Sequence, residues 1–350
     1  MSLLTLVPGL VGGSETYARE LCHTLARVGE LEYAAFVPSI APGAGDGLPS
    51  TLVPEYRARS TMHGRIAAMS LATAMPAPIR RRFDAAGLDV LHFPLSVMIP
   101  RVDRSSAVTT VHDLQHELYP HFFSRAELAY RRAVYGWTVK RSRLLIAISD
   151  YARKTLLDRY ELAPERVRTV HLGIDHARFT PGDAERRPFI LYPANRWPHK
   201  NHERLFAAFA LVRRERPDLR LVLTGQGHER ARLPDGVEAR GHVSADELVA
   251  LYRSAACLVF PSLYEGFGLP PLEAMACGCP VACSNATSLP EVCGDAAEYF
   301  DPHSPDEMAA AVLRAVDGRR VARGLAHAAA FTWDACARGH DTVYRDVTSA

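Results

Sequence analysis

The sequence predicts an α/β protein made of two tandem, doubly wound units with a cleft between them. A length of 350 residues suggests two domains. Short β-branched or Leu-rich runs alternate with helical stretches, which is typical of parallel sheets. The alternation stops at a Pro-, Gly- and charge-rich stretch, Phe179 to Pro188, and then starts again. Paired α/β units bind ligands at the carboxyl ends of their strands, so we expect a ligand there.

The composition excludes several classes of protein. Hydrophobic residues make up 48% and charged residues 23%, which argues against disorder. A net charge of +2 gives no indication of a nucleic-acid partner, and we expect none. No apolar run approaches the roughly 18–20 residues of a membrane span. Because the N-terminus also lacks the basic start of a signal peptide, we expect a cytoplasmic protein.

Lysine and cysteine are distributed unevenly. Only three of the 41 basic residues are lysines, which a GC-rich coding bias would explain: Lys140, Lys154 and Lys200. The seven cysteines are odd in number, which fits a reduced protein. Four of them lie within 277–293, but their spacing lacks the paired C-x2-C of a zinc site. We therefore expect small buried residues there and no metal.

The first unit is expected to contain strands near 2–7, 33–38, 89–93, 106–111, 144–148 and 167–171, and helices near 14–28, 78–86, 124–142 and 150–160. Ser14 is the predicted N-cap of its helix, and Leu21 and Leu25 begin the helix's apolar face. Only residues 2–7 precede the Pro8-Gly9 turn, which is short for a leading strand. We therefore expect a truncated strand or residues before Met1, which mass spectrometry of the native protein would detect.

The second unit repeats the alternation. Its strands are expected at 189–193, 219–224, 257–260 and 280–283, and its helices at 201–215, 245–254, 270–277 and 305–317.

The segment from Pro261 to Ala276 holds two carboxylates eight positions apart. Glu265 lies in the loop after strand 257–260, and Glu273 is expected in the first turn of the following helix. Carboxylates accept hydrogen bonds from vicinal sugar hydroxyls, and a helix N-terminus attracts anions. Alternatively, Glu273 complements the helix dipole and Glu265 is solvated. Residues suited to a close backbone approach and a helix start lie between them: Gly266, Gly268, Pro270 and Pro271.

Two fixed positive charges follow the first strand of the second unit. Arg196 and Lys200 stand four positions apart in the loop 193–201. Arginine binds phosphate as a fork and lysine as a point charge, so a diphosphate is the expected partner. The alternative is a solvated loop.

Two segments of the first unit also follow strands. Gly9 to Glu15 is a glycine-rich turn into a helix, which could meet phosphate or sugar, although it lacks the G-x-G-x-x-G pattern. His112 and Asp113 end strand 106–111, where a histidine faces the cleft or plays a structural part. We expect a polar cleft wall there rather than a metal site, with further members His116, Tyr119 and His121.

Together these segments resemble the family 4 glycosyltransferases, which have two Rossmann-like domains in the GT-B architecture. The resemblance covers nearly the whole chain. It rests on the E-x7-E stretch, Glu265 to Glu273, and on its position in the sequence after the glycine-rich turn, His112-Asp113 and the Arg196/Lys200 loop. Further matches are His171 to Asp175, Gly241 to Val243 and Phe331 to Trp333. The resemblance implies an acceptor-binding domain at 1–175, a nucleotide-sugar domain at 188–330, and a closing helix at 331–350 that crosses back to the first domain.

The resemblance also implies roles for the matched residues. Arg196 and Lys200 would hold the diphosphate of the sugar donor, and Glu273 would bind the ribose. Glu265 would contact the transferred sugar, and His112 would line the reaction centre. The remaining donor-binding residues are expected to be Gly12, Gly13, Val243, Gly266, Phe267, Gly268 and Leu269.

The implied activity is retaining transfer of a hexose from a nucleotide-diphosphate sugar to a glycan, lipid-linked or small-molecule acceptor. A bacterial subgroup that includes mannosyltransferases of polysaccharide assembly shares the pattern of residues 112–120, which favours GDP-mannose. Cationic side chains and a helix N-terminus would stabilise the leaving diphosphate without a metal or other cofactor. A GT-B epimerase or hydrolase and a non-catalytic nucleotide-sugar-binding protein stay open as alternatives, whereas a missing G-x-G-x-x-G disfavours a dehydrogenase.

Helix 124–142 is basic and aromatic. Such a helix can lie on an anionic membrane, here at the inner face of the cell membrane, where lipid-linked acceptors would be found. A solvated arginine face is the alternative. The residues concerned are Tyr130, Arg131, Arg132, Tyr135, Trp137, Lys140, Arg141 and Arg143.

Overall fold

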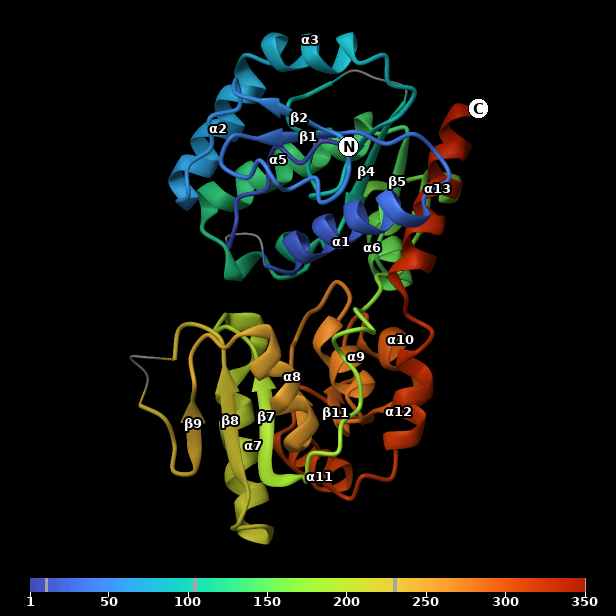
Figure 1. The fold of residues 1–350 in the computed structure, drawn as a ribbon. Helices are drawn as coiled ribbons and strands as arrows, with labels where there is room; N and C mark the ends of the chain where they lie inside the picture. Colours follow the sequence, from blue (N-terminus) through green and yellow to red (C-terminus); the bar gives the residue numbers. More distant parts are fainter. Residues whose placement is uncertain (10–11, 103–105, 229–231, 350) are drawn as a thin grey trace. The chain divides into compact units, whose positions relative to one another are not determined.

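Two units, each formed around parallel β-strands, make up the computed structural model (Figure 1). It describes residues 1–9, 12–102, 106–228 and 232–349. Unit 1 comprises Met1–Gly173 and Trp333–Ala350, and unit 2 comprises Ile174–Thr332. The α/β fold class with two Rossmann-like units is thereby confirmed. Unit 2 begins at Ile174, so the Pro- and Gly-rich stretch before residue 188 belongs to it.

Unit 1 has a four-stranded parallel sheet in the order β3-β4-β5-β6 and a parallel pair, β1-β2. The strands are β1 (Ala35–Pro38), β2 (Ser50–Val53), β3 (Leu91–Phe93), β4 (Ala107–Val111), β5 (Leu144–Ala147) and β6 (Val167–Thr169). The helices are α1 (Gly13–Val28), α2 (Met62–Ala74), α3 (Ala77–Ala85), α4 (Gln115–Leu118), α5 (Arg125–Arg141), α6 (Asp150–Tyr160) and α13 (Trp333–Thr348), with 3₁₀ turns η1 (Pro120–Phe122) and η2 (Pro164–Arg166).

The strand expected at 2–7 does not form. Only Ser2 pairs, in a single parallel bridge with Phe36, and its N–H donates to the carbonyl of His92 at 2.8 Å. This one extended residue joins β1 to β3. The pairing ends because the chain turns next, with the Leu6 N–H donating to the Leu3 carbonyl at 3.0 Å.

The expected N-cap of the first helix is also wrong by two positions. Gly12, not Ser14, caps α1, with φ 53° and no side-chain hydrogen bond. A positive φ favours glycine, because other residues have a Cβ that crowds the backbone there. The Gly9 N–H instead donates to Glu15 Oε2 at 2.8 Å, which ties the turn to the helix. Leu10 and Val11 of the predicted turn lie outside the described residues.

Unit 2 has a six-stranded parallel sheet in the order β12-β11-β10-β7-β8-β9. The strands are β7 (Arg187–Pro193), β8 (Arg220–Thr224), β9 (Val237–Ala239), β10 (Ala255–Phe260), β11 (Val281–Ser284) and β12 (Glu298–Phe300). The helices are α7 (His202–Glu215), α8 (Ala245–Ser254), α9 (Leu269–Ala276), α10 (Leu289–Cys293), α11 (Pro305–Val316) and α12 (Val321–Ala328), with 3₁₀ turns η3 (Pro198–Lys200) and η4 (Gly294–Ala296). Strands β7, β8 and β9 follow one another toward one edge of the sheet, and strands β10, β11 and β12 follow one another toward the other edge.

A buried chain of hydrogen bonds attaches α13 to the rest of unit 1. His340 Nδ1 lies 2.8 Å from the carbonyl of Cys336, which can only accept, so Nδ1 carries the proton. His340 Nε2 therefore accepts from the Tyr17 hydroxyl of α1 at 2.8 Å. The Tyr17 oxygen accepts in turn from the hydroxyl of Thr110 on β4 at 2.8 Å.

The same series of buried hydrogen bonds continues from Thr110 to His92 on β3 and then back to Tyr344 on α13. His92 Nε2 donates to Thr110 Oγ1 at 2.9 Å, which leaves His92 Nδ1 to accept from the Tyr344 hydroxyl at 2.8 Å. These donor and acceptor roles require the rings of both His92 and His340 to be neutral. Burial agrees, because it lowers the pKa of His340 to about 4 and that of His92 well below its usual value.

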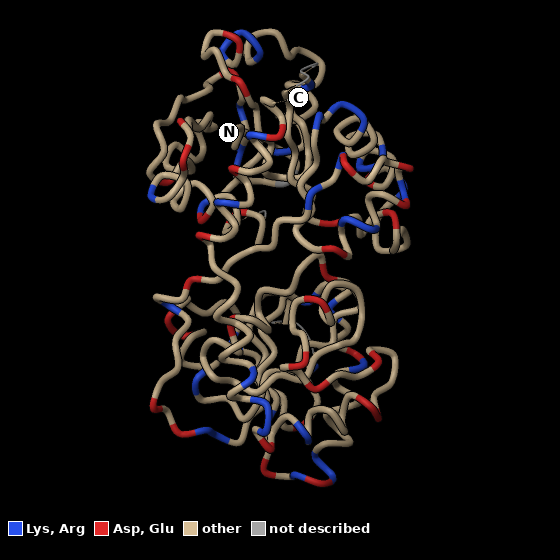
Figure 2. The backbone as a smooth tube through the Cα atoms, turned by 90° about the vertical axis from the view of Figure 1, so that its right-hand side faces the viewer, with Lys and Arg blue, Asp and Glu red and all other residues tan. Residues whose placement is uncertain are grey.

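Basic and acidic residues alternate along the backbone of each unit (Figure 2). No helix among the described residues is long and apolar enough to cross a membrane.

Acid is expected to destabilise unit 1 through these buried rings. Below pH 6.5 the unfolded chain binds a proton at His340 that the folded chain does not bind until about pH 4. The free energy of unfolding should therefore fall as the pH decreases across this window, by about 3 kcal/mol from this residue. His340→Gln should flatten the dependence, measured by urea unfolding across that pH range. The matched change at an exposed ring, His303→Gln, should keep the wild-type slope, and an unchanged slope in His340→Gln would contradict the argument.

Candidate functional site

The carboxyl ends of β7 and β10 carry the two most informative loops of unit 2. These strands are parallel neighbours, with Leu191 opposite Leu258, although more than 60 residues separate them in the chain. Strand β7 begins the half of the sheet that ends at β9, and strand β10 begins the half that ends at β12. The boundary between β7 and β10 is therefore the topological switch point of the sheet, where open α/β sheets bind ligands. The loops after the two strands contain Arg196 and Lys200 on one side and Glu265 on the other.

Lys200 is held at the end of η3. The Tyr192 hydroxyl donates to its carbonyl at 2.7 Å. The next residue, Asn201, is buried with φ 61°, and its Nδ2 donates to the carbonyls of Pro261 at 3.0 Å and Pro302 at 2.7 Å. Asn201 therefore fastens the loop after β7 to the loop after β10.

Lys200 and Glu265 form an ion pair across the switch point. Lys200 Nζ donates to Glu265 Oε1 at 2.6 Å, with side-chain exposures of 14% and 15%. Nζ also lies 5.2 Å from the centroid of the Phe260 ring, within the range of a cation–π contact. The structure thus brings together two predicted site residues that are 65 positions apart.

The backbone around Glu265 is fixed by residues that sequence reasoning missed. The Glu265 N–H donates to Thr287 Oγ1 at 3.0 Å. The Ser288 hydroxyl lies 3.0 Å from the Glu265 carbonyl and 2.7 Å from that of Phe267, so it donates into this loop. The Ser-Leu-Pro-Glu run that opens α10 was the available signal, because it predicts a helix start directly after strand 280–283.

Gly268 and Leu269 begin α9, next to this loop. Gly268 is the N-cap, with φ 117°, and a Cβ there would come 2.7 Å from Leu289 Cδ2. Prolines at 270 and 271 occupy the first turn, as expected. The first N–H groups of a helix lack partners within the helix. Pro270 and Pro271 have no N–H, so the N–H groups of Gly268 and Leu269 are the ones that this end can offer to an anion.

Glu273 lies in the second turn of α9 rather than in the first turn, one position further into the helix than expected. The helix begins at Leu269, so Glu273 is its fifth residue and no acidic residue occupies the first turn. Its Oε2 accepts from the Tyr252 hydroxyl at 3.1 Å. Burial raises the pKa of Glu273 to about 7, while the Tyr252 hydrogen bond and the Arg178 charge oppose that rise. The carboxyl group therefore changes its ionisation near neutral pH.

Arg196 sits where the loops after β7 and β8 meet. Its Nη2 donates to Glu203 Oε1 at 2.7 Å, and its N–H donates to the Gln226 carbonyl at 2.9 Å. Gly225 has φ 101°, and a Cβ there would lie 2.8 Å from the Ala194 carbonyl carbon. A Cβ on Gly227 would lie 3.1 Å from Arg196 Cβ. Two glycines directly after strand 219–224 were the signal that sequence reasoning missed.

Val243 lies in the loop that leads into α8. It is half-buried, and the carbonyl of Gly241, two residues before it, accepts from the Gly225 N–H at 2.7 Å. A groove of about 920 Å³ includes Val243 in its lining, but neither Lys200 nor Glu265.

His112 directly follows β4 in unit 1. Its Nε2 lies 2.8 Å from the Pro94 carbonyl, so Nε2 carries the proton and Nδ1 is left as the acceptor. Its N–H donates to Ser96 Oγ at 3.0 Å, and its ring packs edge-on to Tyr17 at 4.8 Å. Burial lowers the pKa of His112, which favours this neutral form.

The other predicted members of unit 1 differ in their surroundings. Gly12 and Gly13 are exposed at the start of α1, and a Cβ on either would meet nothing within 4 Å among the described residues. His116 is fully buried with its ring 4.5 Å from that of Tyr135, and burial lowers its pKa to about 4. The expectation that His116 lines a polar wall is therefore wrong, because it packs in the core, whereas His121 is exposed.

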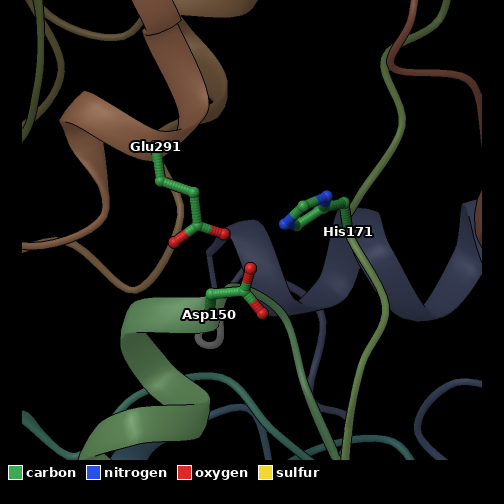
Figure 3. A group of neighbouring side chains, drawn as sticks. All are labelled: Asp150, His171 and Glu291. Carbon is green, nitrogen blue, oxygen red and sulfur yellow. The ribbon is translucent and has the colours of Figure 1, made fainter.

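Side chains of the types that bind metals are present in both units. All seven cysteines are buried and free. Figure 3 shows Asp150, at the start of α6, and His171, which follows β6, both in unit 1, and Glu291 on α10 of unit 2. Asp150 Oδ1 accepts from the Thr169 hydroxyl at 2.5 Å. Among the described residues, neither unit by itself supplies three such ligand atoms within reach of one ion.

Comparisons of the sequence with protein families and curated proteins give consistent results. Residues 11–178 match the family model "Glycosyltransferase Family 4", and residues 174–330 match "Glycosyl transferases group 1". The chain is 33% identical over 274 residues to O-antigen chain mannosyltransferase B of Escherichia coli, which covers 71% of each protein. It is 35% identical over 193 residues to the MMP alpha-(1->4)-mannosyltransferase of Mycolicibacterium hassiacum, covering 52% of this chain and 47% of that protein.

Solved structures agree on the fold. A sucrose-phosphate synthase from Thermosynechococcus elongatus superposes with a TM-score of 0.76 at 21% identity, covering 97% of this chain and 94% of that one. Anabaena HepE, solved with UDP and glucose, gives a TM-score of 0.70 at 16% identity, covering 99% and 98%. The family matches, the mannosyltransferase relatives and the two parallel-sheet units together show that this chain belongs to the family 4 glycosyltransferases of GT-B fold and is a nucleotide-sugar-dependent glycosyltransferase.

Proposed function

We propose that the protein is a retaining mannosyltransferase that moves a hexose from GDP-mannose to a glycan or lipid-linked acceptor. The observation that carries the proposal is the Lys200–Glu265 pair at the switch point of unit 2, directly before the N-terminus of α9. This is one cation, one carboxylate and one helix end at the place where an α/β sheet binds ligands. The 33% identical relative, named an O-antigen chain mannosyltransferase, supports mannose as the sugar.

Binding of the donor would exchange the partner of Lys200. In the free protein its ammonium group is paired with Glu265 at 2.6 Å. A diphosphate carries more negative charge than one carboxylate, so it would take over the ammonium group, with Arg196 as a second cation. Glu265 would then be released to accept hydrogen bonds from the sugar hydroxyls. The nearly buried setting strengthens both interactions relative to water.

The remaining predicted residues would complete the contacts with the donor. Glu273 would accept from the ribose hydroxyls, and the backbone beside Val243 would meet the base. The backbone of Phe267, Gly268 and Leu269 would face the phosphates. In unit 1, the acceptor nitrogen of His112 would take a hydrogen bond from a hydroxyl of the transferred sugar, and Gly12 and Gly13 would allow the backbone of unit 1 to approach the phosphates.

The chemistry would proceed with charge separation at the anomeric carbon. The bond from this carbon to the diphosphate oxygen breaks, and positive charge develops on the sugar while negative charge develops on the phosphate. The acceptor hydroxyl attacks from the same face, and its proton passes to the leaving phosphate, which retains the anomeric configuration. Lys200, Arg196 and the start of α9 would stabilise the leaving group, so the proposal requires no metal.

The choice of donor is testable by thermal stabilisation. A ligand that binds only the folded state increases the free energy of unfolding, by about 2.7 kcal/mol when its concentration is 100 times its Kd. The melting temperature rises accordingly. GDP-mannose should raise it more than UDP- or dTDP-sugars at equal concentration. Incubation with donor alone should leave the sugar nucleotide intact, and nuclear magnetic resonance of the product should show an α-linkage. Consumption of the donor without acceptor would indicate an epimerase or hydrolase, and binding without any turnover a non-catalytic protein.

Loss of the switch-point cation should reduce turnover. Lys200→Ala removes a group that stabilises the leaving diphosphate, so we expect kcat to fall by about 10²–10³-fold. Lys154→Ala is the matched control, because Lys154 is an exposed lysine paired with Asp158 on α6. Circular dichroism should confirm that both variants fold. Near-normal turnover in Lys200→Ala would overturn its assignment to the diphosphate.

The pH dependence of donor binding should report on Glu273. With a pKa of about 7, its carboxylate forms as the pH rises through 7, so kcat/KM for the donor should rise over the same range. Tyr252→Phe removes a hydrogen bond that stabilises the carboxylate, so the midpoint should move to higher pH and the donor KM at pH 7 should rise about fivefold. Tyr299→Phe is the control, because this hydroxyl donates to the Gly294 carbonyl. An unshifted midpoint in Tyr252→Phe would refute the role of the hydrogen bond.

A further inference from the structure

An arginine of α2 lies half-buried in unit 1 without a carboxylate beside it. Arg65 Nε donates to the Thr5 carbonyl at 3.2 Å, and among the described residues its guanidinium group has no other hydrogen bond. Burial lowers the pKa of Arg65, and the ionisable groups that act on it are three tyrosines and Arg131. A cation that is withdrawn from water is normally paired with an anion. The Arg65 side chain therefore offers unused donors and an uncompensated positive charge.

The charged neighbours of this arginine do not supply the anion. Arg131 adds positive charge and is itself paired with Glu127 at 3.1 Å. Asp113 acts on the nearby Tyr135, but not on Arg65. The Oδ1 atom of Asp113 already accepts from the first backbone N–H of α4 at 3.0 Å. In the part of the chain that the structure describes, Arg65 thus has no counter-ion.

Two tyrosine hydroxyl groups beside Arg65 also lack a hydrogen-bond partner. Tyr56 is 1% exposed, and neither its hydroxyl nor that of the half-buried Tyr130 is paired among the described residues. Burial raises the pKa of both hydroxyls and the charge of Arg65 opposes that rise, which shows that they are neighbours. Buried hydroxyl groups are normally hydrogen-bonded, because an unpaired one costs free energy. Two hydroxyl donors and a cation are groups that bind an anion.

These side chains gather at the carboxyl ends of the strands of unit 1. Tyr56 follows β2, and Thr5, which accepts from Arg65, follows the bridge that Ser2 makes with β1. Tyr130 lies on α5, as labelled in Figure 1. The carboxyl edge of a parallel sheet is where α/β units bind their ligands. The position of the cluster therefore favours a ligand over a purely structural role.

A serine connects the cluster to His112. Tyr135, the third tyrosine that acts on Arg65, is hydrogen-bonded to Ser96, which follows β3. The same Ser96 Oγ accepts from the His112 N–H at 3.0 Å. An anion held by Arg65 would therefore be close to the histidine that we expect at the reaction centre.

We propose that Arg65, Tyr56 and Tyr130 form a phosphate-binding subsite that holds the acceptor. The inference rests on the proposed function and adds the chemical class of the acceptor, which would carry a phosphate group. The guanidinium group would bind two phosphate oxygens as a fork, and the hydroxyls would donate to the others. A tetrahedral phosphate receives donors from more directions than a planar carboxylate, which suits donors that come from α2, α5 and the segment after β2.

Phosphate binding tests the subsite without any transfer reaction. Calorimetric titration with inorganic phosphate should use the full chain with Lys200→Ala, so that the proposed donor site contributes little. Adding Arg65→Gln should weaken the affinity about 30-fold, because a charged donor is lost. Tyr56→Phe and Tyr130→Phe should each weaken it about fivefold, so the test does not depend on the folding of Arg65→Gln. Acetate should bind at least tenfold more weakly than phosphate, and equal affinities would overturn the assignment to phosphate.

The stability of Tyr56→Phe separates a binding role from a structural one. Its hydroxyl has no partner among the described residues, so its removal should leave the melting temperature of the free protein unchanged or higher. A lower melting temperature with unchanged phosphate affinity would show a structural hydroxyl and overturn its place in the subsite.

Acceptor kinetics test what the subsite holds. Mannose 6-phosphate with mannose, and mannosyl octyl phosphate with octyl mannoside, are two pairs that differ by a phosphate group. The first pair represents a sugar phosphate and the second a lipid-linked phosphate, so the pair that shows a difference identifies the source. Arg65→Gln should raise the KM of that phosphate-bearing acceptor about 30-fold, and leave the KM of its neutral partner and of the donor unchanged.

Matched controls come from the same unit. Tyr160→Phe also removes a buried hydroxyl that has no partner among the described residues, but Arg65 is not among the groups that act on Tyr160. Arg81→Gln removes an exposed arginine from α3. Neither control should change the phosphate affinity or the acceptor KM, and circular dichroism should show that every variant folds.

The two arms of the experiment fail in different ways. Equal phosphate affinity with and without Arg65→Gln would overturn the subsite. Weakened phosphate binding, with no change in KM for either phosphate-bearing acceptor, would overturn its assignment to the acceptor. Absence of sugar transfer by the wild-type protein would instead contradict the proposed function, and the titration would still decide whether the subsite exists.

Discussion

The parallel pairing of β7 with β10 is the constraint on which the candidate donor site depends. Parallel strands end on the same edge of a sheet, so their following loops emerge side by side. That edge holds Lys200 and Glu265 at 2.6 Å. Asn201 joins the two loops through the carbonyl of Pro261, and Ser288 supports the second loop from α10. A change in strand order would separate all these groups, whatever their local sequences.

Buried and nearly buried polar groups have different roles in the two units. In unit 1, neutral histidines and tyrosines form a chain whose proton positions follow from one carbonyl, and it attaches α13 to β3, β4 and α1. In unit 2, Lys200 and Glu265 are charged and satisfy each other. A neutral chain stabilises a fixed arrangement, because protonation would break it. An ion pair between a cation and a carboxylate can exchange partners when a more negative ligand arrives.

Some predictions failed for physical reasons that no local pattern reveals. Ser14 has a good N-cap side chain, but the turn before α1 places Gly12 at the cap with a positive φ. His116 follows a strand end and is polar, yet it packs against Tyr135 in the core. Helix α2 was not predicted because it is apolar on both faces, which gives no helical periodicity. In each case tertiary packing overrode the local preference.

The sequence by itself determined the two α/β units, most of their strands and helices, and the identity of the residues that gather at the switch point, because period, turn residues and motif spacing are local properties. Only the tertiary structure decided which of these residues meet. The Lys200–Glu265 pair and the Tyr252–Glu273 hydrogen bond both join elements distant in the chain, and such contacts follow from strand order and packing rather than from the residues beside them.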